Sequence, residues 1–205
     1  MKQLTEQQIT DNWKELRTII NNTFSGDRLE KLNKMYDDFE DRMVVAPASA
    51  KKAFHNAMVG GYVEHILHVV KMSQQIRDVW ESNGAMINFT NEELIFAALH
   101  HDLGKIGDLE HDYYVPQDSD WHRKNRGEIY KHNPQLQYMK VPDRGLWLLQ
   151  HYGVKVTDKE YIGKIENLQF MENAFSDFKP NRVIHVATYP NARMVKRNVQ
   201  DATDN

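Results

Sequence analysis

The amino-acid sequence predicts an all-α protein with an N-terminal helical hairpin. Apolar residues recur at helical spacing along most of the chain. Capping boxes precede two of these stretches, because Thr90 and Thr157 are each followed three residues later by a glutamate. The chain has 205 residues and no cysteine, but ten histidines. Disulfides and thiolate metal sites are therefore excluded, and histidine and carboxylate remain as the strong ligands.

The expected helices begin or end at recognisable signals. Thr5 is the expected N-cap of the first helix, Pro142 lies near the start of another, and Gly153 closes that one. The segment between Gly107 and Gly127 follows no period and is expected to be a long polar loop. Helices are expected over residues 5–23, 27–43, 62–80, 90–101, 128–133, 142–151 and 157–175.

These elements suggest three parts of the chain. Residues 1–46 form the N-terminal hairpin, which packs on the core and carries no assigned chemistry. Residues 47–180 form the core, and residues 181–205 form a C-terminal tail. Within the tail, residues 183–186 fit either a strand or a helical turn.

The stretch from Leu94 to Lys105 carries the clearest chemical signal. Leu94, Ala97, Ala98 and His101 follow helical spacing, so an apolar stripe ends in a histidine. Asp102 follows at once, where the helix C-terminus favours a cation. Imidazole and carboxylate together suit zinc, manganese, iron and related ions. The sequence therefore predicts a metal site at the end of this helix.

Three further histidines are expected to point inward. His65 shares a helical face with apolar residues, His132 lies in a short helix, and His151 follows Trp147 and Leu148 at helical spacing. Each histidine alone is more often a hydrogen-bonded core residue than a ligand. Together they favour a shared cation, because burying so many imidazoles without partners is costly.

Charge and hydropathy limit the partners. The net charge of −3 argues against general electrostatic binding of nucleic acid, although a local basic groove remains open. The chain has no apolar run of about 18 residues, and its first residues are polar. We therefore expect a soluble, unexported, cytoplasmic protein without a membrane partner.

Two segments resemble the HD-domain metal-dependent phosphohydrolases. Gly60-Gly61-Tyr62-Val63-Glu64-His65 is similar to the first histidine helix of that family, and His101-Asp102-Leu103-Gly104-Lys105 is similar to its defining pair. The context is most similar to the HD domains of bacterial 3′–5′ exoribonucleases. The resemblance runs from about residue 47 to 175 and implies an HD-like helical bundle with a central metal site.

The resemblance also implies a ligand set. His65, His101, Asp102 and a distal carboxylate would hold one ion, and Asp102 could bridge to a second held by His132 and His151. Glu166 is the candidate distal ligand, in an Ile-Glu-Asn-Leu context where the family usually has aspartate. Asp158 and Asp177 are the alternatives. The expected cofactor is one or two divalent ions of manganese, iron, zinc, nickel or cobalt, with magnesium as a further option.

The implied activity is hydrolysis of a phosphate ester in a nucleotide or short nucleic acid by metal-activated water. Asp102 and Lys105 are the candidate catalytic residues, since Lys105 could neutralise phosphate oxygens; a solvated lysine is the alternative. His122, Arg123, Lys124 and Arg126 are the candidate substrate-binding residues, or else a solvated basic stretch. An HD-type diiron oxygenase and a non-catalytic, metal-stabilised nucleotide-binding or regulatory module are the rival functions. The oligomeric state is not predicted.

Overall fold

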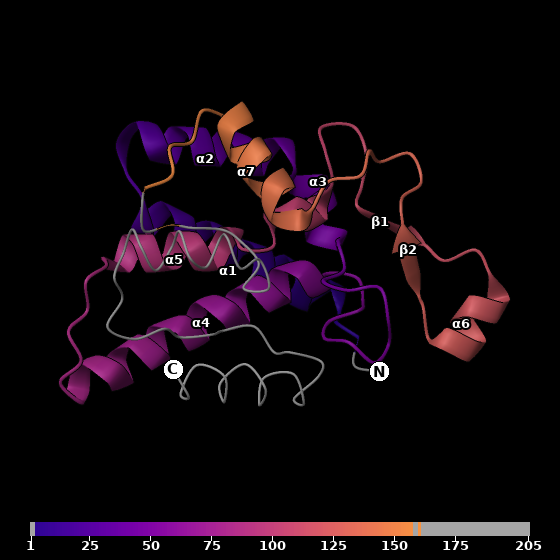
Figure 1. Ribbon diagram of the computed structural model, residues 1–205, viewed down its shortest axis with the longest axis horizontal. Coiled ribbons are helices and arrows are strands. Elements are labelled where there is room, and N and C mark those ends of the chain that lie inside the picture. Colours follow the sequence, from indigo (N-terminus) through magenta and orange to yellow (C-terminus); the bar gives the residue numbers. More distant parts are fainter. Residues whose placement is uncertain (1–2, 158–159, 161–205) are drawn as a thin grey trace, which may run out of the picture.

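The computed structural model describes residues 3–157 and residue 160, and this part of the chain is mostly helical (Figure 1). A two-stranded antiparallel hairpin is the departure from the predicted all-α class. No helix in the described part is long and apolar enough to span a membrane. The elements are α1 (Glu6–Thr23), α2 (Gly26–Asp38), α3 (Glu40–Val45), α4 (Gly61–Ser82), α5 (Asn91–His100), the 3₁₀ helix η1 (Leu103–Ile106), β1 (Tyr114–Pro116), α6 (Asp120–Arg126), β2 (Tyr130–His132) and α7 (Val141–His151).

The N-caps predicted at Thr5 and Thr90 are confirmed. Thr5 caps α1 and Thr90 caps α5, each in a complete capping box. Glu160 Oε2 accepts a hydrogen bond from the Thr157 backbone N–H at 2.8 Å, which is half of the second predicted box. The remainder of the helix predicted over 157–175 lies outside the described residues, as does the tail.

The single helix predicted over 27–43 is wrong, because the structure has α2 and α3 with a break at Phe39. The Phe39 side chain is buried and lies 6.0 Å from the ring of Tyr152, centroid to centroid. Met43 on α3 is also buried. The bend allows both side chains to reach the core. The stability gained from this burial outweighs the local preference for one continuous helix.

The helix predicted over 128–133 is also wrong, because this segment contains strand β2. β2 pairs with β1, which lies in the segment predicted as an irregular loop, so that Tyr114 faces His132 and Pro116 faces Tyr130. α6 lies between the two strands. Pairing with a distant strand determines the secondary structure of this region. The residue pattern within one segment does not reveal such pairing. We call residues 113–132 the arm, which projects to the right of the helices in Figure 1.

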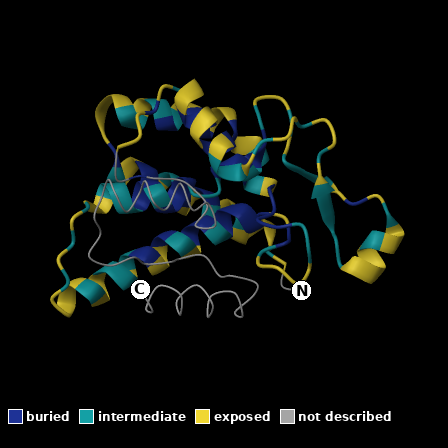
Figure 2. Cartoon of the chain, viewed as in Figure 1, coloured by how far each residue is buried: buried dark blue, intermediate teal, exposed yellow. Residues whose placement is uncertain are grey.

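The helices share one hydrophobic core, which includes side chains from the N-terminal helices. Leu16 and Ile20 of α1 and Met35 of α2 belong to the same buried cluster as Phe96 of α5 and Leu148 of α7. Figure 2 shows the buried residues where these helices face one another, whereas α6 has none. The core therefore holds α4, α5 and η1 in fixed positions, and these elements carry the candidate site.

His100 is a structural histidine within this core. It is fully buried, its Nε2 lies 3.3 Å from the Tyr36 hydroxyl, and its Nδ1 lies 2.7 Å from the Phe96 carbonyl oxygen. Burial lowers the pKa of His100 from 6.5 to about 3, although the contact with the Phe96 carbonyl opposes the shift. His100 is therefore neutral in the native protein at any ordinary pH.

We expect His100 to make the protein less stable in mild acid. Between pH 6.5 and about 3 the unfolded chain protonates this imidazole and the native chain does not. The free energy of unfolding then falls as the pH falls through this window, by up to about 1.4 kcal/mol per pH unit. Urea unfolding of the parent and of His100→Gln between pH 3.5 and 7 measures this free energy. The variant should show the shallower dependence of the free energy of unfolding on pH. His68→Gln, at an exposed position of α4, is the control; equal slopes for parent and His100→Gln would refute the assignment.

The residues after Asp102 are held by close packing of η1 on α7. A Cβ added at Gly104 would lie 2.1 Å from the Val141 carbonyl oxygen, a distance at which the backbone must move. Gly145 of α7 lies in the same interface, but a Cβ there would meet its nearest atom at 3.4 Å. Only the first glycine is therefore required by packing.

Gly104→Ala should destabilise the protein by about 2 kcal/mol, the usual cost of overpacking. Gly145→Ala should leave stability unchanged or raise it, because alanine favours the helix and meets ordinary contacts. Thermal unfolding of both variants provides the comparison. Equal stability of the two variants would show that η1 is not packed on α7 as the structure has it.

Candidate metal centre

Three side chains from α4 and the end of α5 converge on one point. His65 Nε2 lies 3.1 Å from His101 Nε2, and both nitrogens lie 3.4 Å from Asp102 Oδ2. His65 belongs to the second turn of α4, while His101 is the C-cap residue of α5 and Asp102 precedes η1. The structure therefore brings together three of the four residues that the resemblance implies as ligands of the first ion.

The orientation of His101 suits a ligand. Its Nδ1 lies 2.8 Å from the Ala98 carbonyl oxygen, which can only accept a hydrogen bond. Nδ1 must therefore carry the proton when the ring is neutral, and Nε2 presents a lone pair toward His65 and Asp102. Metal-binding histidines are commonly fixed in this way by a backbone carbonyl.

Asp102 is the electrostatic centre of the group. Burial acts to raise the pKa of its carboxyl, but the contacts with the His101 and His65 rings and the charge of Lys105 outweigh it and hold the pKa well below its usual range. Asp102 is thus a carboxylate at any pH at which the protein would work. Such a charge in a half-buried site attracts a cation strongly.

Lys105 lies against Asp102 rather than in solvent. Its Nζ donates to Asp102 Oδ2 at 2.7 Å and to the Ala48 carbonyl oxygen at 3.1 Å. The solvated alternative for this lysine is therefore wrong, because only 17% of its side chain is exposed. Its ammonium group lies beside the oxygen that the two histidines also approach.

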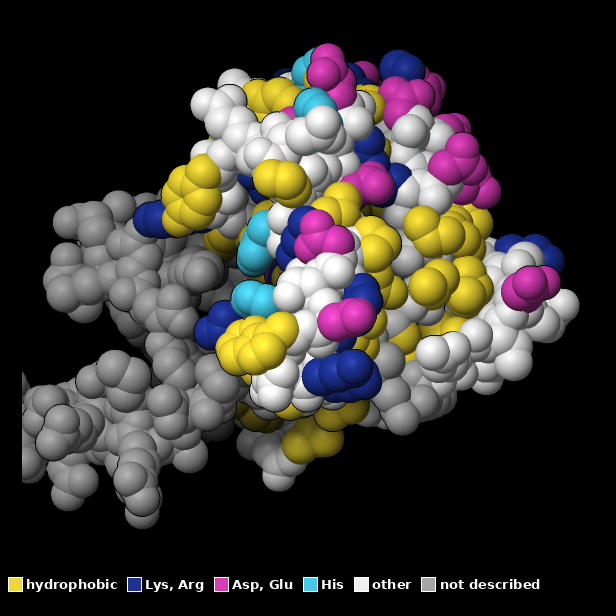
Figure 3. Space-filling view, turned by 90° about the vertical axis from the view of Figure 1, so that its right-hand side faces the viewer, with side chains coloured by type: hydrophobic (Ala, Val, Ile, Leu, Met, Phe, Trp, Pro, Cys, Tyr) yellow, Lys and Arg dark blue, Asp and Glu magenta, His cyan; other side chains and the backbone are white. Residues whose placement is uncertain are grey.

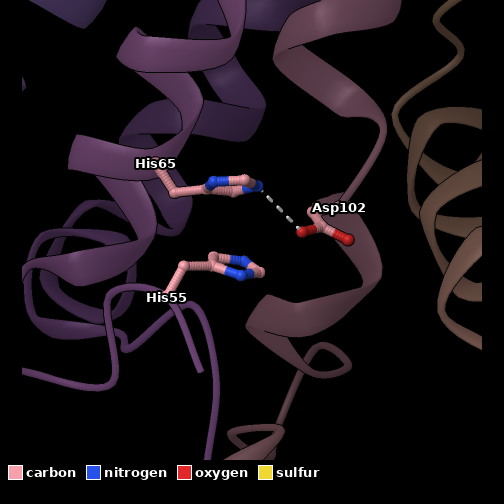
Figure 4. A group of neighbouring side chains, drawn as sticks. All are labelled: His55, His65 and Asp102. Carbon is pink, nitrogen blue, oxygen red and sulfur yellow. Dashed lines mark ion pairs between the residues drawn. The ribbon is translucent and has the colours of Figure 1, made fainter. Parts of the chain in front are cut away.

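His55 joins the group, and the sequence analysis did not identify it. His55, His65 and Asp102 each offer a ligand atom within 4.8 Å of the others. The imidazole of His55 stacks on that of His65, with ring centroids 4.5 Å apart, and Figure 4 shows both rings directed toward Asp102. His55 lies in the irregular segment 46–60, where no helical period could place it. Its position just before the first histidine helix was the available signal.

The environment of His55 keeps its ring neutral. His55 is exposed, but the groups packed around its ring still desolvate it; this desolvation, and then the charges of His65 and Lys105, lower its pKa from 6.5 to about 4. A neutral imidazole retains the lone pair that a metal requires. His55 is therefore available as a ligand throughout the neutral and mildly acidic range.

The spacing of the donor atoms fits a small divalent ion. A tetrahedral ion with bonds of about 2.0–2.1 Å holds its donor atoms about 3.3–3.4 Å apart. The observed separations among His65, His101 and Asp102 are 3.1–3.4 Å. Imidazole and carboxylate are also the donors that zinc, manganese and iron accept. These residues could therefore hold a metal ion.

His132 lies in a separate aromatic cluster. It is exposed at the end of β2, and its ring centroid lies 4.8 Å from that of Tyr113 and 5.4 Å from that of Tyr114. Burial, and then the charges of Tyr113 and Asp102, raise the pKa of Tyr114. His132 is not part of the group that holds His55, His65 and Asp102.

His151 lies beside α2. Its ring packs against Trp147 and Tyr152, and the Tyr152 hydroxyl donates to Asp38 at 2.9 Å. The positive charge of His151 contributes to the lowered pKa of Asp38, after the hydrogen bonds from Lys34 and Tyr152. The contacts of His151 thus connect it to α2 and not to Asp102.

The four candidate substrate-binding residues belong to α6, at the outer end of the arm. His122 Nδ1 lies 2.6 Å from Glu128 Oε2, and Arg126 lies 3.8 Å from the other oxygen of that carboxylate. Arg123 pairs with Asp120, while Lys124 is exposed. Figure 3 shows acidic, basic and histidine side chains mixed with hydrophobic ones on this face. Acidic partners thus offset much of the charge of the predicted basic stretch.

The distal ligand falls outside the described residues. Glu166 and its alternatives Asp158 and Asp177 all belong to the part of the chain that the structure does not describe. Among the described residues, His55, His65 and Asp102 form a group that could hold a metal ion, and His101 Nε2 lies 3.1 Å from His65 Nε2 and 3.4 Å from Asp102 Oδ2.

No family model, no curated protein and no solved structure matches this chain.

Proposed function

We propose that this chain is a metal-dependent phosphohydrolase that cleaves a phosphate ester of a nucleotide or short nucleic acid. The observation that carries the proposal is the convergence of His65, His101 and Asp102 at metal-ligand spacing. The resemblance of Gly60–His65 and His101–Lys105 to the HD-domain phosphohydrolases supports the choice of reaction. That choice is an inference from residue pattern and geometry together.

The residues have distinct roles in this proposal. His65, His101 and Asp102 would hold the ion, with His55 beside them. When bound, the ion would supply a water that is a nucleophile near neutral pH and would polarise a phosphoryl oxygen. Lys105, held by Asp102 and the Ala48 carbonyl, would place a positive charge beside the phosphate and stabilise the charge that develops on it.

The substrate would approach from the exposed side of the group. His101 retains 36% exposure of its side chain and His55 is exposed, whereas Asp102 is largely covered. Tyr113 and Tyr114 in the arm are partly exposed and offer aromatic faces on which a base can stack. We therefore place the nucleotide between the His55 segment and the arm.

The experiment is a hydrolysis screen with metal-free protein. Nucleotides and a generic phosphodiester are supplied with manganese, iron, zinc, nickel, cobalt or magnesium, both in air and without oxygen. We expect hydrolysis that depends on the metal and not on oxygen. His65→Gln should lose it, and the control His68→Gln, one turn further along α4, should keep it.

Other outcomes would replace the proposal. Product that forms only with iron and oxygen would favour the diiron oxygenase. Tight metal and nucleotide binding without turnover under any condition would favour the non-catalytic module.

A further inference from the structure

His55 is unusually well fixed for a residue in an irregular segment. The Ser49 hydroxyl donates to the His55 carbonyl oxygen at 2.6 Å, and the next residue, Asn56, accepts at its own carbonyl oxygen from the Ala48 N–H at 3.1 Å. The arm holds the same segment from its other side, because the Lys52 N–H donates to the Gly127 carbonyl oxygen at 2.8 Å. The backbone on both sides of His55 is therefore tied down.

Asn56 adopts a strained conformation to complete this arrangement. Its φ of 49° makes it the one non-glycine residue with positive φ in the part of the chain that the structure describes. Asparagine tolerates the left-handed region better than most residues, but the conformation still has a cost. The cost is offset by hydrogen bonds from the Asn56 side-chain amide to Glu64 Oε2 at 3.0 Å and to the Gly61 carbonyl oxygen at 3.3 Å.

The Asn56–Glu64 hydrogen bond joins the neighbours of two donor histidines. Asn56 follows His55 in the sequence, and Glu64 precedes His65. Glu64 is buried, with 8% exposure, so its carboxylate faces the protein and not solvent. Gly61 permits the close approach, since a Cβ there would lie 2.1 Å from the Asn56 carbonyl oxygen. A contact between the irregular segment and α4 thereby sets the distance between the two imidazoles.

We infer that Asn56 and Glu64 are positioning residues that hold His55 over His65, so that His55 serves as a fourth ligand of the metal centre. This inference rests on the proposed metal dependence and goes beyond it in assigning His55 and its support. In Figure 4 the ring of His55 lies beside that of His65, and both face Asp102. The resulting set has three imidazoles, from His55, His65 and His101, and one carboxylate, from Asp102.

The test is a titration of the metal-free protein with Co(II), monitored by the visible absorption of the bound ion. The intensity and position of its bands depend on the number and type of ligands. His55→Ala should change the spectrum and weaken Co(II) binding. Asn56→Gly should have the same two effects. Glycine adopts the same backbone conformation and removes only the side chain. Loss of support around a ligand typically weakens metal binding by about 10–100-fold.

A paired exchange separates positioning from general stability. Asn56→Asp places an acceptor against the Glu64 carboxylate and should weaken Co(II) binding. Adding Glu64→Gln restores one donor and one acceptor with the roles reversed, and should recover both the spectrum and most of the affinity. If Asn56→Gly does not fold, this exchange still tests the contact, because aspartate also tolerates the left-handed region. His68→Ala on α4 is the control and should match the parent.

The possible failures are distinguishable. A parent that binds Co(II) with a spectrum unchanged by His55→Ala would overturn the assignment of His55 and leave the metal centre standing. A His55→Ala change that Asn56→Gly and Asn56→Asp do not reproduce would overturn the positioning role. A parent that binds no Co(II) would overturn the proposed function, and the inference with it.

Discussion

Replacing Asp102 by asparagine should abolish both metal binding and turnover. Asp102 Oδ2 is the atom on which His65, His101 and Lys105 all converge, at 3.4, 3.4 and 2.7 Å. Asparagine keeps the shape of the side chain but removes the charge. Without it, a divalent ion would enter a site that contains neutral imidazoles and the positive charge of Lys105. We expect metal affinity to fall by at least about 100-fold, beyond the loss of a supporting residue.

The measurement is metal affinity by calorimetric titration, with hydrolysis assayed on the same samples. Asp78→Asn provides the control, because Asp78 is an exposed residue of α4 that pairs with Arg77 at 2.7 Å. It should behave as the parent. An Asp102→Asn variant that binds metal within about threefold of the parent, a difference of less than 1 kcal/mol, would show that the carboxylate is not a ligand.

Replacing Lys105 by methionine should separate metal binding from catalysis. The ammonium group lies 2.7 Å from the carboxylate oxygen and repels any cation bound there. Its removal should leave metal affinity unchanged or increase it. Turnover should fall by about 10²–10³, which is the usual loss when one positive or hydrogen-bonding group at the developing charge is removed.

Methionine preserves much of the aliphatic length of lysine, so packing around the side chain is largely retained. Lys34→Met on α2, where the lysine pairs with Asp38 at 3.0 Å, is the matched surface control. Calorimetry and initial-rate kinetics on both variants give the two quantities. Loss of metal affinity in Lys105→Met together with an unchanged rate per bound ion would assign Lys105 a structural role instead.

Helix patterns in the sequence brought out the first candidate ligands because those residues lie on or directly after regular helices. His65 is placed by the period of α4, and His101 and Asp102 by the end of α5. The N-cap at Thr5 and the capping box at Thr90 were equally local and were confirmed. Local spacing is sufficient when a side chain and its support belong to one helix.

The same approach failed where contacts between distant segments decide the structure. β2 forms because β1 pairs with it, and the break at Phe39 follows the packing of its ring on Tyr152. His55 is positioned by Asn56 and Glu64, from the irregular segment and α4. None of these contacts leaves a periodic pattern in a single stretch of sequence. His132 and His151, the predicted ligands of a second ion, are outside the group of His55, His65 and Asp102 for the same reason. The positions of β2 and α7 depend on tertiary packing.

The central claim is that His65, His101 and Asp102 bind one divalent ion, and anomalous diffraction from crystals grown with zinc tests it most directly. Data collected on both sides of the zinc absorption edge locate the ion without reference to any model of the site. We expect one strong peak within about 2.0–2.2 Å of His65 Nε2, His101 Nε2 and a carboxylate oxygen of Asp102. The absence of a peak there at saturating zinc, or a peak only at surface positions such as Asp38 and His151, would contradict the account.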